Sequence, residues 1–318
     1  MSDEPKLSRR RALRVLGAGL AGAASACGSG GGGGRGGGGG VGNGDEPHVP
    51  TSDGWFRRFF QKHYRKMTPQ EVEAAIVRIE AGYRTSYGRD IEVGNAPAAE
   101  GVVYGYALSI DRCKGYRDCV DACVKENNQG SDPDLEYIRV LEVERGQWNL
   151  TQANHDYDHE SVPQPGQMYL PVQCFQCDNP PCVDACPVDA TWKERDGIVV
   201  IDYERCIGCR YCQTACPYGA RHFNWSAPEL TAEQVNPDTH YLGNRPRPAG
   251  VVEKCNYCVH RVRDGRMPAC QEACPTGARV FGNLLDPDSE IRYVLENKTV
   301  FRLKEELGTQ PKFWYFSG

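Results

Sequence analysis

The sequence predicts an α+β fold in which a small cysteine-rich unit is duplicated, with inserted loops and hairpins and a helical extension on the N-terminal side. Three observations predict it. Of the 16 cysteines, 15 fall into four groups between Cys113 and Cys274. Three of these groups end in the same proline-containing turn, at residues 187–190, 217–220 and 275–278. Short strand-like segments lead into the groups, so residues 101–318 have the pattern of a repeated unit.

The first 27 residues match a signal for export by the twin-arginine route, with Arg9 and Arg10 as the paired arginines. The weakly apolar segment that follows, residues 15–26, is too short to span a bilayer. It ends in a sequence that resembles a lipoprotein cleavage box, although Ala24 stands where leucine is usual. We therefore expect a protein on the extracytoplasmic face of the cytoplasmic membrane or in the periplasm, with a lipid on Cys27. The alternatives are a plain cleaved signal and a chance basic N-terminus.

Two further segments separate this signal from the cysteine groups. Residues 28–50 are rich in glycine and cannot bury a core, so they should form a flexible linker. Residues 51–100 should form a helical extension, with residues 51–88 helical, because Thr68 and Glu71 form a capping-box pattern ahead of an apolar face made by Val72, Ala75 and Ile79. We expect a helical pair, including the aromatic-rich residues 55–64, that packs on the body. A docking arm for a partner subunit is the alternative.

Charge and hydropathy exclude several classes of function. The chain has 37 basic and 42 acidic side chains, and removal of residues 1–26 leaves 32 and 40, a net charge of −8. This acidic balance argues against nucleic-acid binding. After Cys27 no run of 18 apolar residues occurs, so quinone chemistry would need a separate membrane subunit. The sequence offers no catalytic base, nucleophile or pocket for a small-molecule substrate, which predicts a chain without turnover of its own.

Strands are expected at residues 102–110, 137–144 and 198–202. The second of these alternates apolar and polar residues and should be half-buried. Residues 124–173 and 226–254 are rich in Pro, Asn and Asp, and we expect them to be inserted loops and hairpins.

The spacing of the cysteines predicts iron–sulfur ligands. The third group has the C-x2-C-x2-C-x3-C-P run of bacterial ferredoxins, in which three thiolates hold one cluster and the fourth holds another. The second and fourth groups keep this skeleton with the third cysteine delayed. The three groups are Cys174, Cys177, Cys182 and Cys186; Cys206, Cys209, Cys212 and Cys216; and Cys255, Cys258, Cys270 and Cys274. Structural zinc and a disulfide framework are alternatives that fit this repeated spacing less well.

The first group departs from the pattern. It contains Cys113, Cys119 and Cys123, and its shared Gly and Arg align it with the third group. In this register Tyr116 stands where the third group has Cys209. One site should therefore lack a thiolate.

The chain resembles the four-cluster electron-transfer subunits of the dimethyl sulfoxide, tetrathionate and polysulfide reductase family. The resemblance lies in the order of the four cysteine groups and in residues 255–261, 268–278, 281–290 and 303–312. The resemblance begins at about Gly101. It implies that the first group pairs with the fourth, and the second with the third, by exchange of their last cysteines. The implied sets are Cys174, Cys177, Cys182 and Cys216; Cys206, Cys209, Cys212 and Cys186; Cys255, Cys258, Cys270 and Cys123; and Cys113, Cys119 and Cys274.

The first three sets would each hold a [4Fe-4S] cluster. For the last set we expect a [3Fe-4S] cluster, because it has only three thiolates. A fourth [4Fe-4S] cluster with oxygen from Tyr116, Asp118 or water is the second choice, and an empty site the third. His222 and His260 flank cysteine loops, and we expect them to make surface or outer hydrogen bonds and not to bind metal.

The resemblance implies a relay of single electrons between a molybdopterin-type catalytic subunit and a membrane subunit that reacts with quinone. One alternative is a carrier for a hydrogenase or for a cytochrome-linked, quinone-oxidising complex. Another is a cluster-bearing maturation or structural protein.

Overall fold

The computed structural model describes residues 66–130, 135–150 and 152–318. Its first helix, α3 (Pro69–Tyr87), begins where the sequence predicts a helix. Thr68 and Glu71 form the expected capping box, each side chain accepting a hydrogen bond from the other residue's backbone amide. Ala75 and Tyr83 are buried in the main core, so this helix packs on the body. The predicted signal, the predicted linker and the aromatic segment 55–64 lie outside the described residues.

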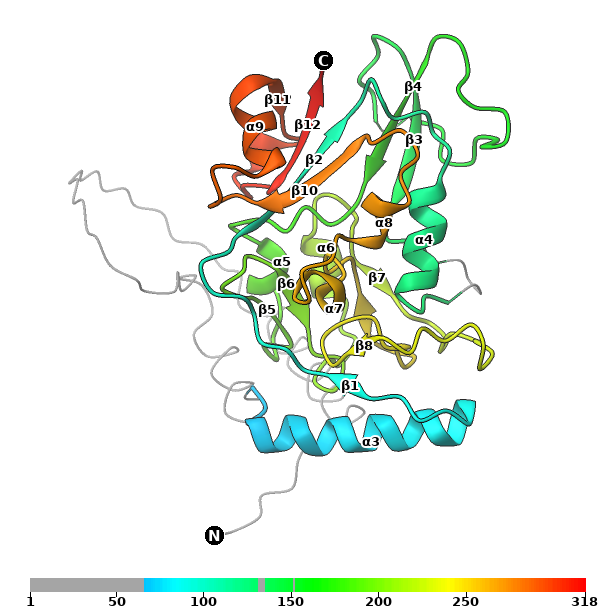
Figure 1. Cartoon of the computed structure of the whole chain (residues 1–318), viewed down its shortest axis with the longest axis vertical. Coiled ribbons are helices and arrows are strands. Elements are labelled where there is room, and N and C mark those ends of the chain that lie inside the picture. The colour runs from blue at the N-terminus through cyan, green and yellow to red at the C-terminus, as the bar shows by residue number, and fades with distance from the viewer. Residues whose placement is uncertain (1–65, 131–134, 151) are drawn as a thin grey trace, which may run out of the picture. The chain divides into compact units, whose positions relative to one another are not determined.

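A four-stranded sheet joins segments that are far apart in the sequence (Figure 1). Strand β2 (Tyr104–Ser109) lies between β10 (Arg279–Asn283), which is antiparallel to it, and β12 (Phe313–Ser317), which is parallel. Strand β11 (Thr299–Phe301) pairs antiparallel with β12 and completes the order β10-β2-β12-β11.

The two faces of this sheet are buried against different partners. Helix α9 (Glu290–Asn297) covers one face, where Ile291 and Val294 pack with Ala107 of β2. Because side chains alternate along a strand, the neighbouring Tyr106 and Leu108 point to the opposite face and enter the main core. The sheet therefore backs the cysteine loops on one side only.

Four two-stranded sheets and several short helices form the rest of the body. The sheets are β1 (Val93–Gly94) with β8 (Thr239–His240), β3 (Arg139–Glu144) with β4 (Gln167–Val172), β5 (Thr191–Lys193) with β6 (Val199–Ile201), and β7 (His222–Phe223) with β9 (Val252–Glu253). The helices are α4 (Asp118–Glu126), α5 (Pro181–Asp184), α6 (Tyr211–Ala215), α7 (Val259–Val262), α8 (Ala269–Glu272) and the 3-10 turn η2 (Glu305–Leu307). Among the described residues, none of the helices is both long and apolar enough to cross a membrane.

The three expected strands are present as β2, β3 and β6, each shorter than its predicted range. The predicted insertions contain the hairpin β3–β4 and the short strands β8 and β9, so their assignment to loops and hairpins is confirmed. One detail was wrong: β3 is not half-buried, since both Val140 and Leu141 are buried. Asn154 of the following loop pairs with Glu142 through an isolated antiparallel bridge, so this loop lies along the edge of β3.

Candidate iron–sulfur sites

The four cysteine loops share one backbone conformation. In each loop the residue two positions after the first cysteine has a positive φ: 82° at Gly115, 45° at Gln176, 72° at Gly208 and 56° at Tyr257. This left-handed residue turns the chain sharply, so that the neighbouring side chains converge on one point. At Gly208 only glycine fits, because a Cβ atom there would lie 2.1 Å from the carbonyl oxygen of Gly250.

The turns after the fourth cysteines repeat as well. Asp189, Gly219 and Gly277 each stand three residues after a fourth cysteine, with φ values of 48°, 60° and 60°. Glycine, and to a lesser degree aspartate, tolerates this conformation, which explains the residue types at this position of the sequence repeat.

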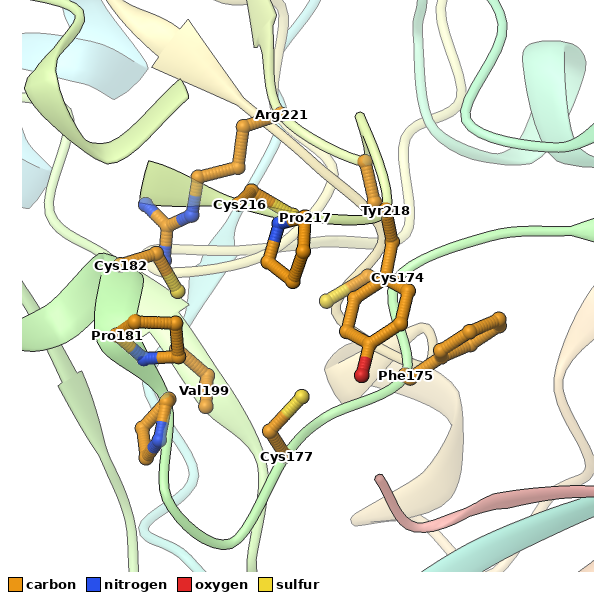
Figure 2. Close-up of a pocket in the computed structure, with 12 residues that line it drawn as sticks. Cys174, Phe175, Cys177, Pro181, Cys182, Val199, Cys216, Pro217, Tyr218 and Arg221 are labelled. Atoms are coloured by element: carbon orange, nitrogen blue, oxygen red, sulfur yellow. The ribbon is translucent and has the colours of Figure 1, made fainter. Parts of the chain in front are cut away.

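The Cys174 site is a pocket lined by Cys174, Cys177, Cys182 and Cys216. Figure 2 shows the sulfur atoms of Cys174, Cys177 and Cys182 around its centre, with Arg221 at the edge beside Cys182. Burial and the three neighbouring thiols raise the pKa of Cys177 to about 12. Such a thiol keeps its proton in neutral solution and becomes a thiolate only when a metal takes the proton's place.

The Cys206 site gathers Cys206, Cys209 and Cys212 with Cys186 of the preceding group. Burial, and then the nearby thiols of Cys186, Cys212 and Cys206, raise the pKa of Cys209 to about 12. Backbone amides already point at two of the sulfur atoms: that of Ala190 lies 3.3 Å from Cys186 Sγ, and that of Val252 lies 3.4 Å from Cys206 Sγ.

The Cys255 site is the most deeply buried. Its four cysteines are Cys123, Cys255, Cys258 and Cys270, and all of them are buried. Burial raises the pKa of Cys123 well above its usual value, and the other three thiols raise it further.

Polar side chains surround the sulfur atoms of this site. Gln129 donates from Nε2 to Cys123 Sγ at 3.3 Å, and Asn127 Nδ2 lies 3.5 Å from the same sulfur. The Tyr106 hydroxyl lies 3.3 Å from Cys270 Sγ. Hydrogen bonds to sulfur are one of the means by which a protein sets a cluster's reduction potential.

The Cys113 site has three thiols and an exposed rim. Cys113, Cys119 and Cys274 line one pocket, together with Tyr116 and Asp118. Burial raises the pKa of Cys113 to about 11. Burial also acts to raise the pKa of Cys274. Hydrogen bonds to its sulfur, of which that from the Thr276 hydroxyl has the largest effect, outweigh burial and lower this pKa. Tyr116, at the position where a fourth thiolate would stand, is 41% exposed.

The structure places the four sites in one row. Arg279 contacts both Cys119 of the Cys113 site and Cys270 of the Cys255 site, and Cys255 lies near Cys174. Arg221 lies beside both Cys182 and Cys212, so the Cys174 and Cys206 sites are neighbours as well. The order along the row is therefore the Cys113, Cys255, Cys174 and Cys206 sites.

Two buried arginines belong to these sites, and the sequence interpretation missed both. Arg221 and Arg279 are 2% and 3% exposed. Each stands five residues after a fourth cysteine, so the repeated Gly-Ala-Arg was a signal that could have identified them. Burial opposes their charge, but nearby thiols more than compensate and raise the pKa of both side chains.

These arginines test whether the sites fit an iron–sulfur cluster. The hydrogen bonds of these guanidinium groups go to uncharged side chains: Arg221 donates to Thr191, and Arg279 donates to Gln173 and Cys119. A buried cation without an anionic partner costs several kcal/mol, of the order of ~3–5 kcal/mol when an ion pair is broken. An anionic cluster with thiolate ligands supplies that partner, so the residues present fit such a group. Within the described ranges, no three Cys, His, Asp or Glu side chains are grouped tightly enough for a single metal ion.

The two histidines lie beside the loops. His260 is buried and its Nε2 lies 2.6 Å from Glu126 Oε1, three residues after Cys123. His222 is half-buried, and burial lowers its pKa to about 4. His260 thus makes an outer hydrogen bond of the kind expected, although in the interior and not at the surface.

Several known proteins are similar to this chain in sequence. A family model described as a 4Fe-4S dicluster domain matches residues 166–250 and 243–284. A dimethyl sulfoxide reductase iron–sulfur subunit of Halobacterium salinarum is 43% identical, and the match covers 68% of this chain and 79% of the relative. A tetrathionate reductase subunit of Salmonella typhimurium is 36% identical over 66% of this chain and 71% of its own length. A polysulfide reductase subunit of Wolinella succinogenes is 35% identical over 66% and 92%.

This protein belongs to the family of iron–sulfur subunits of reductases of the dimethyl sulfoxide, tetrathionate and polysulfide type. The resemblance stated from the cysteine motifs is therefore confirmed. As a member of this family it carries iron–sulfur clusters and transfers electrons within an oxidoreductase complex, of which it is not the catalytic subunit.

Proposed function

We propose that this chain relays single electrons through three [4Fe-4S] clusters and one [3Fe-4S] cluster. They would connect a molybdopterin-type catalytic subunit with an integral membrane subunit that reacts with quinone. The observation that carries this proposal is the row of four thiol sites, in which each site adjoins the next. When bound, an iron–sulfur cluster accepts and donates one electron.

The proposed ligands are the four cysteine sets of the sites described above. The Cys174, Cys206 and Cys255 sites would each use four thiolates, and the Cys113 site three. Two of the proposed sets combine groups that lie far apart in the sequence, as Cys123 and Cys255 do. The repeated φ values in all four loops support an origin by duplication of a two-cluster unit. The protein's own part is to hold the thiolates, donate hydrogen bonds to sulfur and exclude water.

The nuclearity of the Cys113 site rests on Tyr116. A phenol keeps its proton near neutral pH and competes poorly with thiolates for iron. The corner iron beside Tyr116 is therefore absent in this proposal. An oxidised three-iron cluster is paramagnetic, whereas oxidised four-iron clusters of the ferredoxin type are silent, so the oxidised protein should show one EPR signal that disappears on mild reduction.

Tyr116→Cys tests this assignment. The variant should lose the EPR signal of the oxidised protein and gain about one iron per chain, from about fifteen to about sixteen. Tyr211→Cys is a matched control, because Tyr211 is also 41% exposed and adjoins the complete Cys206 site; it should keep both the signal and the iron content. An oxidised wild-type protein that is EPR-silent with about sixteen irons would reject the three-iron cluster.

Export and anchoring complete the proposal. Twin-arginine export carries folded proteins, which suits a chain that receives its clusters in the cytoplasm. A single acyl group anchors a protein to a membrane only marginally, so a lipid on Cys27 would act together with the membrane partner.

Purification of the native complex under anaerobic conditions tests the partners. We expect one co-purifying subunit that contains molybdenum or tungsten and one that spans the membrane. A partner that contains nickel would instead identify a hydrogenase. A chain that purifies alone from solubilised membranes would contradict the proposed complex.

A further inference from the structure

Arg279 lies between two thiol sites. Its Nη2 donates to Cys119 Sγ of the Cys113 site at 3.3 Å, and its Nη1 lies 3.9 Å from Cys270 Sγ of the Cys255 site. Gln173 Oε1 accepts a hydrogen bond from the same Nη1 at 2.8 Å and fixes the side chain in this position. One cation therefore touches sulfur ligands of two sites.

Arg221 occupies the corresponding place in the other pair of sites. It lines the Cys174 pocket, and its charge interacts with Cys182 and Cys174 of that site and with Cys212 of the Cys206 site. Its Nη2 donates to Thr191 Oγ1 at 2.9 Å, whereas Nε and Nη1 have no hydrogen-bond partner although they are buried. Figure 2 shows the guanidinium group turned toward Cys182.

The two arginines are equivalent by position. Arg221 follows Cys216 by five residues, and Arg279 follows Cys274 by five. Thr191, which holds Arg221, follows Cys186 by the same number. At the junction between the two pairs, Tyr257 lies near Cys255 and Cys174, and the buried Lys254 donates from Nζ to the Cys255 carbonyl oxygen at 2.9 Å.

We propose that Arg221 and Arg279 are charge bridges, each of which raises the reduction potentials of both clusters in its own pair. The inference rests on the proposed ligand sets. Reduction adds one negative charge to a cluster, and a fixed positive charge in a buried, poorly screened position favours that form. When an electron passes within a pair, one cluster is oxidised and the other reduced by one electron, and the same arginine stays beside both. It therefore raises the two potentials of its own pair together and leaves the difference between them unchanged.

Anaerobic, EPR-monitored redox titration of the full chain tests the proposal. Arg221→Gln should shift the redox equilibria of the Cys174 and Cys206 clusters tenfold or more toward the oxidised form, and each tenfold step is about 59 mV for one electron. The Cys113 and Cys255 clusters should shift less than threefold. Arg279→Gln should give the opposite distribution, so each variant is the control for the other.

Lysine variants separate charge from packing. Arg221→Lys and Arg279→Lys keep the positive charge, and their potentials should stay near those of the wild type. If a glutamine variant does not load its clusters, loading of the lysine variant at wild-type potentials still supports the charge bridge. Loss of clusters in both variants, equal shifts of all four clusters, or a shift in one cluster of a pair only would overturn it. The wild-type titration tests the ligand sets separately, because it must show four redox centres whatever the variants do.

Discussion

Gln129→Leu should lower the reduction potential of one cluster and leave the fold intact. Gln129 is buried and donates from Nε2 both to Cys123 Sγ at 3.3 Å and to the Cys123 carbonyl at 3.0 Å. Leucine has a similar size and removes both hydrogen bonds. The carbonyl keeps two other donors, the backbone amide and Nδ2 of Asn127, at 3.0 and 2.9 Å. No buried backbone group is therefore left without a partner.

The size of the effect follows from the charge on sulfur. A hydrogen bond to a charged group contributes roughly 1.5–3 kcal/mol. It is stronger in the reduced cluster, which carries one more negative charge. If about half of this energy is the difference between the reduced and the oxidised cluster, loss of the hydrogen bond changes the free energy of reduction by ~1 kcal/mol. This is roughly a fivefold shift of the redox equilibrium. That shift corresponds to about 40 mV in a one-electron couple.

The assay is an EPR-monitored titration of the Gln129→Leu variant beside Gln147→Leu. Gln147 is exposed and its side chain donates to Glu144, away from the cysteines, so its replacement should leave all potentials unchanged. Only the Cys255 cluster should move in the Gln129 variant, and it should move down. An unchanged potential of that cluster, or a drop in all four, would refute the role given to this hydrogen bond.

Three further predictions concern export, the cysteine loops and acid stability. Replacement of Arg9 and Arg10 by lysine should leave the protein in the cytoplasm with its clusters intact, and Cys27→Ala should abolish labelling with fatty acid. Gly208→Ala should prevent cluster insertion at the Cys206 site, because the added Cβ would lie 2.1 Å from a carbonyl oxygen at a φ of +72°; iron content measures this loss. Burial lowers the pKa of His240 to about 4, so between pH 6.5 and 4 the unfolded state binds a proton at this residue more readily than the folded state does. The free energy of unfolding should therefore fall by up to ~3 kcal/mol as the pH drops from about 6.5 toward 4. In His240→Leu the unfolding midpoint should depend less steeply on pH over this range.

Each of these has a direct control. Equal fatty-acid labelling of the wild type and the alanine variant would remove the lipid anchor while leaving export open. For the loop, Gly82→Ala in α3 has open space around the new Cβ and should keep full iron content while stabilising the helix by about 1 kcal/mol. For acid stability, an identical pH dependence in wild type and His240→Leu would contradict the assignment to this histidine.

Local features of the structure could be predicted from the sequence, because they depend on residues that are near one another in the chain. The capping box at Thr68 formed as expected, and so did the strands that lead into the cysteine groups. The alignment of the first and third groups on a shared Gly and Arg also has a structural cause. Gly115 and Gly208 have positive φ values, and so do Arg117 and Arg210 at the start of the helices that follow.

Contacts between distant segments could not be derived from spacing alone. Strand β2 pairs with β12, so that Tyr106 lies opposite Phe313, a residue near the C-terminus. The gathering of Cys123 with Cys255 was expected only through the family resemblance. The arginines were missed because a charged residue in a repeat is ordinarily exposed. Only the structure shows that Arg279 is buried beside the sulfur atoms of Cys119 and Cys270.

The central claim is that this chain holds four redox centres and passes electrons without turnover of its own. Anaerobic coulometric titration of the isolated full chain, with iron counted on the same sample, tests it most directly. The account predicts about fifteen irons and a reversible uptake of about four electrons per chain, with no reduction of any oxyanion or sulfur substrate. Uptake of fewer than about three electrons by an iron-replete chain, or reduction of such a substrate by the chain alone, would contradict it.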